Sequence, residues 1–380
     1  MNSNKLIVML DPRGVITSGG TDVINRQAEY AKKLDLIDRS TKTSFLIISS
    51  SQKSFFINIK KMNFNLTSVS KPTYNSYRFS KLAFQMLKTI DSDVNLFVVG
   101  DPWESYVSAY FLKKCLKKSI PIQIQVHADI ADPRWRRISI RNLIRFWIAK
   151  KTLLDASSVR CVSWQQKLNL MKYFGIDEGI ISVIPIPIRT SKPISNKSNR
   201  PRTIGFIGRI HTDRGIWQFI DLVKTLNQRD KSFKILIAGD GPEKDKFFAK
   251  LESAFPKNRF KYVGQIDQQK LHRTWKSVGV LVSMAPVESY GRVLRESLLA
   301  GVPVWATASS GVVDLLDCAE PGTVKILDLE KNESDLHKDF ESLLKVKVGS
   351  KFRDKFIKEN NSYADKLAKS WIDSIENFKK

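Results

Sequence analysis

Cysteine, histidine and long apolar runs are all scarce in this chain of 380 residues, which has 3 cysteines and 4 histidines. Cys115, Cys161 and Cys318 lie far apart, without a CxxC spacing. This argues against a disulfide framework or a zinc site and is typical of a reducing cytoplasm. No apolar run reaches the roughly 18 residues that span a bilayer, and the apolar segment at 6–10 is too short for a signal peptide. We therefore expect a cytoplasmic protein.

Glycine and proline are also modest in number, with 18 and 14 residues, which excludes collagen-like repeats and wholesale disorder. Positive charge is the abundant feature, because 63 Lys and Arg against 38 Asp and Glu give a net charge of +25. A field of this size attracts polyanions such as nucleic acid, anionic lipid headgroups and phosphorylated ligands. The charge alone does not choose among these partners.

Short apolar segments alternate with helical patterns in both halves of the chain. The segments with the composition of buried strands are 5–10, 96–100, 122–126, 203–207, 233–238, 260–263, 278–283 and 302–306. Strands that alternate with helices indicate βαβ units and a parallel sheet covered on both faces. We therefore predict an α/β fold with two Rossmann-like domains, whose ligands bind beyond the carboxyl ends of the strands.

The polar, proline-broken segment 189–202 has the composition of a linker between two domains. A chain of this length is expected to hold two domains of roughly 150 residues or more each. We place the first domain at 1–190 and the second at 191–362. The segment 363–380 carries apolar residues at helical spacing and predicts a last helix.

The first motif with chemical content runs from Gly208 to Gly215 and includes Arg209 and Arg214. It follows a predicted strand and precedes a predicted helix. N–H groups at a helix N-terminus and two guanidinium groups suit a diphosphate, because their geometry and charge match phosphate oxygens. A solvated basic loop would have the same composition, so this motif alone leaves both interpretations open.

Glu288 and Glu296 form the second candidate site. Glu288 follows a predicted strand, and Glu296 lies inside a helix predicted from Gly291 to Ala300. A carboxylate accepts hydrogen bonds from two hydroxyls, which is a common way to hold a sugar or a ribose. Glu296 could instead be an exposed helix acid paired with Arg292 at i−4.

The stretch from Ala285 to Val304, which contains both glutamates, closely resembles the donor-site motif of family-four glycosyltransferases, also called glycosyl transferases group 1. These are retaining enzymes with the GT-B fold. Further resemblances in the family's order are Gly208–Gly215 to its diphosphate motif, Ala238–Pro242 to its second strand and loop, Val263–Gly264 to the strand beside the nucleobase, and Ser310–Val312. The resemblance implies two parallel sheets that face each other across a cleft. The first domain would bind the acceptor, the second the nucleotide sugar, and the helix at 363–380 would pack back on the first domain.

The resemblance also assigns roles to individual residues. Arg209 and Arg214 would stabilise the leaving diphosphate, Glu288 would bind the sugar hydroxyls, Glu296 the ribose, and His127 would contact the sugar from the first domain. Other donor-binding candidates are Gly19, Gly20, Gly208, Gly241, Val263, Ser289, Tyr290, Gly291, Arg292 and Val293. A UDP- or GDP-sugar is expected as the donor substrate. No cofactor and no metal are expected, because the donor half carries neither a DxD motif nor a histidine cluster.

The first half matches the family less well than the second. Gly19 and Gly20 resemble its glycine-rich loop but could form only a tight turn. His127 could be a hydrogen-bonded histidine at a strand end. Arg214 stands where the family usually has lysine, and Asp314 where a glutamate is usual.

A basic amphipathic pattern extends from Arg134 to Lys151. Arg137, Arg141 and Arg145 recur at i, i+4 and i+8 and predict one helical stripe, while Trp147 and neighbouring aliphatic residues supply apolar surface. A basic helix with tryptophan is typical of the surface of an anionic membrane, here the inner face of the plasma membrane. The pattern also fits a core-packing helix with a solvated basic face. Stacking on single-stranded nucleic acid is the weakest interpretation, and no nucleic acid is expected as a partner.

These patterns predict a retaining glycosyltransferase that transfers a hexose-like sugar to a saccharide or lipid-linked acceptor, in cell-surface polysaccharide biosynthesis. Two alternatives stay open at this point. One is a nucleotide-sugar epimerase on the same fold. The other is a basic protein that binds membrane or nucleic acid and has an inactive transferase site.

Overall fold

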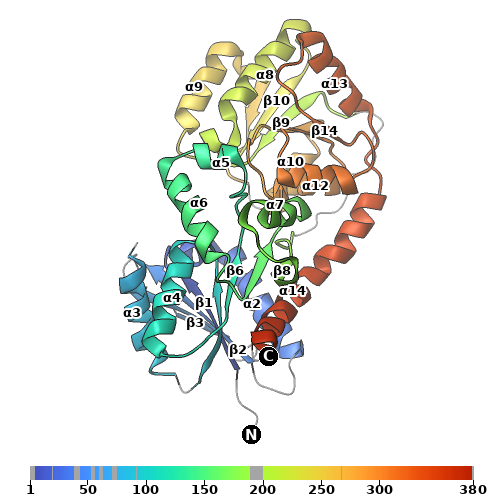
Figure 1. Ribbon diagram of the computed structural model, residues 1–380. Helices are drawn as coiled ribbons and strands as arrows, with labels where there is room; N and C mark the ends of the chain where they lie inside the picture. The colour runs from blue at the N-terminus through green and yellow to red at the C-terminus, as the bar shows by residue number, and fades with distance from the viewer. Residues whose placement is uncertain are drawn as a thin grey trace. The chain divides into compact units, whose positions relative to one another are not determined.

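The computed structural model describes residues 5–18, 20–37, 43–52, 56–59, 63–70, 75–90, 92–188, 200–266 and 268–378. The chain divides into two compact units, one made of residues 1–187 and 361–380 and the other of residues 188–360. Most of the predicted linker lies outside the described residues. Each unit is a mainly parallel sheet with helices packed on it, as Figure 1 shows.

The first unit contains an eight-stranded sheet in the order β3-β4-β2-β1-β5-β6-β7-β8. All neighbours are parallel except β3, which is antiparallel to β4. The strands are β1 (Lys5–Asp11), β2 (Thr43–Ser51), β3 (Phe56–Ile59), β4 (Phe64–Ser70), β5 (Val94–Val99), β6 (Ile122–Gln125), β7 (Ser158–Cys161) and β8 (Ile181–Val183). The helices between them are α1 (Val15–Ser18), α2 (Gly20–Ile37), α3 (Ser76–Leu87), α4 (Glu104–Leu116), α5 (Pro133–Arg137), α6 (Ile140–Thr152), α7 (Trp164–Phe174) and the 3-10 helix η2 (Glu178–Ile180).

The core of the first unit is completed from the far end of the chain. The last helix, α14 (Lys351–Phe378), begins twelve residues before the predicted 363 and contributes its second half to this core. Trp371 is fully buried there, with its ring 4.9 Å from that of Phe45 on β2 and 6.1 Å from that of Tyr30 on α2. Its indole N–H donates to Gln123 Oε1 at 2.8 Å. The apolar spacing at 363–380 therefore marks the face that closes the first unit.

The second unit contains a six-stranded parallel sheet in the order β11-β10-β9-β12-β13-β14. The strands are β9 (Thr203–Ile207), β10 (Lys234–Ala238), β11 (Phe260–Tyr262), β12 (Val280–Ser283), β13 (Val304–Ala306) and β14 (Val324–Ile326). The helices are η3 (Thr212–Arg214), α8 (Ile216–Arg229), α9 (Lys244–Ala254), η4 (Lys257–Arg259), α10 (Gln268–Trp275), α11 (Arg292–Leu299), α12 (Ser310–Cys318) and α13 (Glu333–Lys345).

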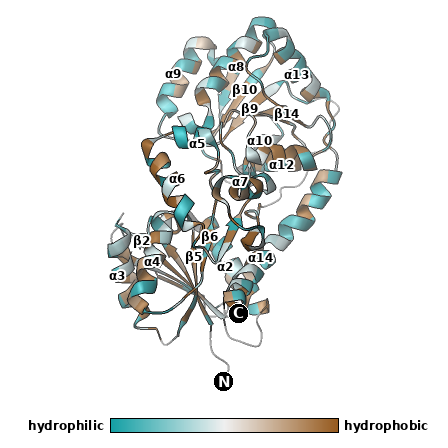
Figure 2. Cartoon of the chain, in the orientation of Figure 1, coloured by the Kyte–Doolittle hydropathy of each residue, from teal (hydrophilic) through white to brown (hydrophobic). Residues whose placement is uncertain are grey.

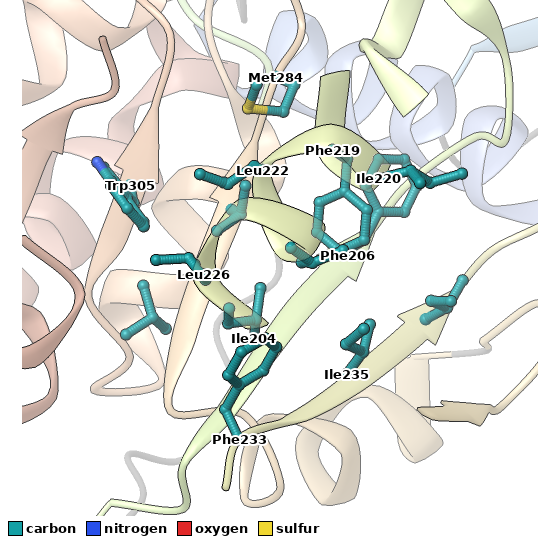
Figure 3. Packing of buried hydrophobic residues seen from close by; sticks show 14 of the residues in the cluster. Ile204, Phe206, Phe219, Ile220, Leu222, Leu226, Phe233, Ile235, Met284 and Trp305 are labelled. Carbon is teal, nitrogen blue, oxygen red and sulfur yellow. The ribbon is translucent and has the colours of Figure 1, made fainter. Parts of the chain in front are cut away.

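The core of the second unit explains why α8 forms where the sequence predicts a helix. The residues at helical spacing on α8 are buried against β9 and β10, as Figure 3 shows for Phe219 and Ile220 beside Phe206. The rings of Phe206 and Phe219 lie 5.2 Å apart. This apolar face fixes the loop between β9 and α8, which carries the first motif.

In both sheets, the first strand lies inside the sheet, and later strands are added on both of its sides. In the first unit β2 pairs with one edge of β1 and β5 with the other, and in the second unit β10 and β12 flank β9 in the same way. Ligands of open parallel sheets bind at the carboxyl ends of the strands beside such a switch point. Each unit has a pocket at this position.

The prediction that Arg137, Arg141 and Arg145 form one stripe on a single helix is wrong. Arg137 ends the short helix α5, and a new helix begins at Ile140, where the Ser139 side chain accepts the Asn142 N–H and caps it. Arg141 and Arg145 lie on this second helix, and both form ion pairs with Glu104, at 3.0 Å and 2.6 Å. The Arg145 side chain is only 14% exposed, so it is not part of a solvated basic face.

In the part of the chain that the structure describes, we find no helix whose length and hydropathy would let it cross a membrane.

Candidate functional site

The pocket of the second unit has a volume of about 370 Å³ and lies where β9 and β12 end. Seven of the predicted site residues line it: Gly208, Arg209, Arg214, Glu288, Arg292, Val293 and Glu296. The lining also includes Phe206, Ile207, Leu281, Val282, Ser283 and Leu294, which the motifs did not single out. All of these except Leu294, which lies on α11, are strand residues, and they carry no sequence signal for a site because their composition is explained by the sheet itself.

The loop between β9 and α8 is held in place by close backbone packing. Gly215 has φ +67°, and a Cβ at this position would lie 2.2 Å from the Met284 carbonyl oxygen at the end of β12. Only glycine accepts both constraints without strain. The loop therefore presses against the end of β12, and this contact places Arg209 and Arg214 at the pocket.

Gly241 and Val263 support this loop rather than line the pocket. A Cβ on Gly241 would lie 2.2 Å from the Ile210 carbonyl oxygen, so the loop after β10 packs directly on the loop after β9. The Val263 N–H donates to Ile237 O at 3.0 Å, and the Tyr262 hydroxyl donates to Gly239 O at 2.9 Å. These contacts fix the edge of the pocket region without contributing to its lining.

Glu288 is the best positioned carboxylate of the pocket. Its Oε2 accepts from Arg214 Nη1 at 2.7 Å, and its Oε1 accepts the Gly291 N–H at 3.0 Å. Its backbone carbonyl accepts the Gly311 N–H at 2.7 Å. Each carboxylate oxygen keeps further acceptor capacity, so Glu288 can receive hydroxyl groups of a ligand without giving up these bonds.

Arg209 forms an ion pair with Asp213, four residues further along the chain. Asp213 Oδ1 also lies 2.9 Å from His211 Nδ1 and 3.9 Å from Arg214 Nε. Asp213 was not predicted as a site residue, although its spacing from Arg209 is a signal that could have revealed it. Since exposed ion pairs of this kind contribute little to stability, the Arg209 guanidinium can turn to an anionic ligand at small cost.

The amino end of α11 faces the same pocket. Gly291, at φ +72°, precedes the helix and provides no side-chain cap, and the first helical residues Arg292, Val293 and Leu294 all line the pocket. Uncapped N–H groups at a helix N-terminus favour anions. One turn further, burial raises the pKa of Glu296, although the charge of Arg292 opposes this. The two side chains are 3.8 Å apart, beyond hydrogen-bond range.

Ser289 and Tyr290 lie next to the pocket lining but not in it. Tyr290 is buried, with the Arg295 guanidinium 3.9 Å from its ring centre. Arg295 is buried as well and donates to Gly311 O at 3.4 Å. This stacked pair supports the segment that carries Glu288 and Gly291.

His127 and the glycine-rich loop belong to the first unit. Gly19 lies outside the described residues, and Gly20 is the first residue of α2. His127 lines a separate cavity of about 350 Å³ at the carboxyl ends of β1 and β6. Desolvation of its ring in the cavity, together with the charges of Arg160, Arg26 and Arg13, lowers the pKa of His127 although the residue is exposed at the cavity mouth, so its imidazole is neutral at physiological pH.

Among the described residues, Asp230, His337 and Glu341 lie close enough together to hold a metal ion. The Arg202 guanidinium already bridges the two carboxylates, at 2.6 Å from Asp230 and 2.5 Å from Glu341. Asp230 precedes β10, so the group is at the amino end of the sheet, away from the pocket. Its chemistry is that of a structural ion-pair network.

The two sheets with their helices define an α/β fold of the GT-B class, and comparison with known proteins supports this class. Residues 187–363 match the model of the family described as glycosyl transferases group 1. This range covers the second unit almost from end to end.

Particular relatives extend the comparison. The chain is 29% identical over 218 residues to the 2-deoxystreptamine glucosyltransferase of Streptomyces kanamyceticus, covering 53% of this chain and 56% of that protein. It is 23% identical over 246 residues to the phosphatidylinositol N-acetylglucosaminyltransferase GPI3 subunit of Saccharomyces cerevisiae, covering 61% of this chain and 52% of that protein. The chain spans about half the length, or less, of the curated relatives it matches.

A solved structure of similar fold is that of Anabaena HepE in complex with UDP and glucose. The TM-score is 0.65 at 16% identity, over 95% of this chain and 99% of that chain. The likeness extends over both units and confirms the predicted fold class.

Proposed function

We propose that this chain is a retaining, metal-independent glycosyltransferase that binds a UDP- or GDP-sugar in the pocket of the second unit. The observation that carries the proposal is one pocket lined by two arginines, a fixed glutamate, a helix N-terminus and a second, half-buried glutamate. Arginine and helix N–H groups suit a diphosphate, and carboxylates suit sugar and ribose hydroxyls. The UDP bound to HepE agrees with a uridine nucleotide as the donor.

The acceptor we propose is a saccharide or a lipid-linked saccharide used in cell-surface polysaccharide biosynthesis. The names of two relatives support sugar transfer to an acceptor of this general kind, because they are a phosphatidylinositol N-acetylglucosaminyltransferase subunit and a 2-deoxystreptamine glucosyltransferase. One name describes transfer to 2-deoxystreptamine and the other transfer to phosphatidylinositol, a lipid.

Catalysis in this proposal is mainly electrostatic. As the bond between the sugar and the diphosphate breaks, negative charge develops on the leaving phosphate. Arg209, Arg214 and the N–H groups at the start of α11 stabilise that charge, and they are positioned before the reaction begins. Glu288 orients the sugar through its hydroxyls. The leaving phosphate takes the proton of the attacking acceptor hydroxyl, so no protein side chain is assigned as the base.

A thermal-shift panel of UDP, GDP, ADP and their sugar conjugates, with and without EDTA, tests the donor site. One nucleotide should raise the Tm selectively, since a ligand at 100 times its Kd adds about 2.7 kcal/mol to the stability of the native state. EDTA should leave the shift unchanged. Glu296→Gln should weaken binding of that nucleotide about 10-fold, as expected for the loss of a hydrogen bond to a charged group.

The pH dependence of nucleotide binding distinguishes a direct role of the Glu296 carboxylate from a general effect of the substitution on the protein. Because its folded-state pKa is raised, the charged carboxylate opposes folding at neutral pH, and this cost vanishes as the pH falls below the unfolded-state pKa. Nucleotide binding to the unchanged protein should weaken as the pH falls through the raised pKa, whereas Glu296→Gln should show no such step. Glu252→Gln, exposed on α9, is the control. A panel in which no nucleotide shifts the Tm would count against the proposed donor site.

We further propose that α6 attaches the protein to an anionic membrane surface. Its outer face carries large apolar side chains in water, including Ile140 at 80% and Trp147 at 60% exposure, with Leu143 and Ile144 beside them. Figure 2 shows hydrophobic and hydrophilic residues interspersed along this helix. Arg137, Arg141, Lys150 and Lys151 are exposed around this face. Apolar side chains surrounded by cations suit an interface rich in anionic lipid.

Replacing Ile144 and Trp147 together with aspartate should abolish sedimentation with vesicles that contain phosphatidylserine, because it removes apolar area and adds negative charge at the centre of the face. Leu329→Asp, at an exposed apolar position of the second unit, should sediment like the unchanged protein. Unaltered sedimentation of the double variant would contradict the membrane proposal, and so would equal binding of the unchanged protein to neutral vesicles.

A further inference from the structure

The cavity of the first unit is built like a ligand site, and only His127 among its lining residues was singled out by sequence. It has a volume of about 350 Å³ and lies beside the switch point, where β1, β5, β6 and β7 end. Its polar lining consists of Asp11, Arg13, Arg26, Gln27, Tyr30, Asp101, Ser105, Gln125, His127 and Arg160. A volume above about 300 Å³ is in the range of small-molecule sites.

The two carboxylates of this cavity are already saturated by their own chain neighbours. Asp11 accepts the N–H groups of Val15 at 3.0 Å and Ile16 at 2.7 Å, and the Ser49 hydroxyl at 2.8 Å. Asp101 accepts the N–H groups of Trp103 and Ser105, both at 3.0 Å, and the Ser105 hydroxyl at 2.6 Å. Asp101 also pairs with Arg13 at 3.0 Å. Both acids therefore hold the loops at the strand ends and offer little to a ligand.

Arg160 brings a buried positive charge to the cavity. It is a charged residue on strand β7, and it is only 2% exposed. Its guanidinium donates to Ile184 O at 2.8 Å, to Gln125 Oε1 at 3.0 Å and to Pro185 O at 3.1 Å. These three acceptors are neutral, so they fix the position of the guanidinium without cancelling its charge. A buried cation held by neutral groups favours an anion as its neighbour.

Two buried amide atoms in the lining have no hydrogen-bond partner. They are Gln27 Oε1 and Gln125 Nε2, on side chains that are 9% and 3% exposed. The orientation of the Gln125 amide is fixed, because its oxygen accepts from Arg160. The cavity thus presents an open acceptor and an open donor beside the buried cation. An unsatisfied buried polar atom costs about 1–3 kcal/mol, which a hydroxylated ligand would recover.

We infer that this cavity binds the anionic part of the acceptor, as a saccharide that carries a phosphate or a carboxylate. Arg160 and Arg26 supply the positive charge, Gln125 donates to the ligand and Gln27 accepts from a ligand hydroxyl. Tyr30 and the neutral His127 complete a polar wall. That the ligand is an acceptor rests on the proposed function. The anion site itself is defined by residues of the first unit alone.

Isothermal titration of the full chain with glucose 6-phosphate, glucuronate and glucose tests the site. At least one anionic sugar should bind 10-fold or more tightly than glucose, and the preferred one tells whether phosphate or carboxylate is recognised. Arg26→Gln and Gln27→Leu should each weaken that binding about 10-fold or more. Gln27→Leu should not lower the Tm of the free protein, because it removes an unsatisfied buried oxygen. Arg78→Gln, exposed on α3 of the same unit, is the control.

Two outcomes would overturn the inference. One is that neither anionic sugar binds better than glucose. The other is that Arg209→Ala, in the second unit, abolishes binding of the anionic sugar, which would place the anion in the pocket of the second unit. UDP and GDP titrated into the same protein report on the proposed donor site separately. A protein that binds UDP or GDP but no anionic sugar disproves this inference alone. A protein that binds an anionic sugar but neither UDP nor GDP disproves the donor site alone.

Discussion

Replacing Arg209 with alanine should lower kcat about 100-fold or more, the effect of removing one group that stabilises charge in the transition state. Arg209 lines the pocket, and its ion pair with Asp213 is on the surface. Its contribution to folding is therefore small, and the Tm should stay the same. Steady-state kinetics with the nucleotide sugar found in the thermal-shift panel would measure the change.

A control of the same chemistry lies on the same unit. Arg229, at the end of α8, is also 53% exposed and pairs with an acid, Glu333, at 3.5 Å. Arg229→Ala should keep the kcat of the unchanged protein. If Arg209→Ala were fully active, Arg209 would have no role in stabilising the leaving group.

Trp371→Ala should destabilise the first unit by about 3–5 kcal/mol, the range for removing a buried aromatic side chain. The tryptophan is fully buried between Tyr30 and Phe45, and its loss also leaves the buried Gln123 Oε1 without its donor. Hydrogen exchange should quicken in β1 and β2 of the first unit, with little change in β9 and β10 of the second. Hydrogen exchange measured strand by strand reports the stability of each unit separately, whereas a single melting curve would not.

Trp147→Ala is the matched control, since it is the same substitution in the same unit at a side chain that is 60% exposed. Its exchange pattern should match that of the unchanged protein. Equal protection of β1 and β2 in the Trp371 variant would show that α14 does not stabilise this core.

Much of the second unit follows from the sequence because its signals are local. The apolar segment that forms β9, Gly208 after it, and the apolar face of α8 lie within a short stretch, and each has one simple structural cause. The same holds for Glu288, Gly291 and Glu296, whose spacing places them around one strand end and one helix start.

The remaining site residues could not be predicted, because they are brought together by strand order. Gln27, Gln125 and Arg160 come from α2, β6 and β7, and none of them stands in a motif. Arg160 even weakens the pattern of a buried strand, since a charged residue interrupts its apolar alternation. The basic stripe failed for a related reason: Glu104, which pairs with Arg141 and Arg145, lies 37 and 41 residues away from them in the chain.

The path of the chain through the two units has a consequence for synthesis on the ribosome. The second unit is one continuous stretch, residues 188–360, so all of its strands can associate while the C-terminal residues are still being added. The first unit is translated earlier, but it waits for residues 361–380 to complete its core. Gln123 and Trp371, which meet there, are 248 residues apart in the sequence.

Contacts that close so long a loop form slowly. Until α14 arrives, the apolar side chains of β1, β2 and α2 that it will cover stay open to water. The domain that is made first is therefore expected to be the last to reach its native state, and the nascent chain is the stage at which this protein most needs a chaperone.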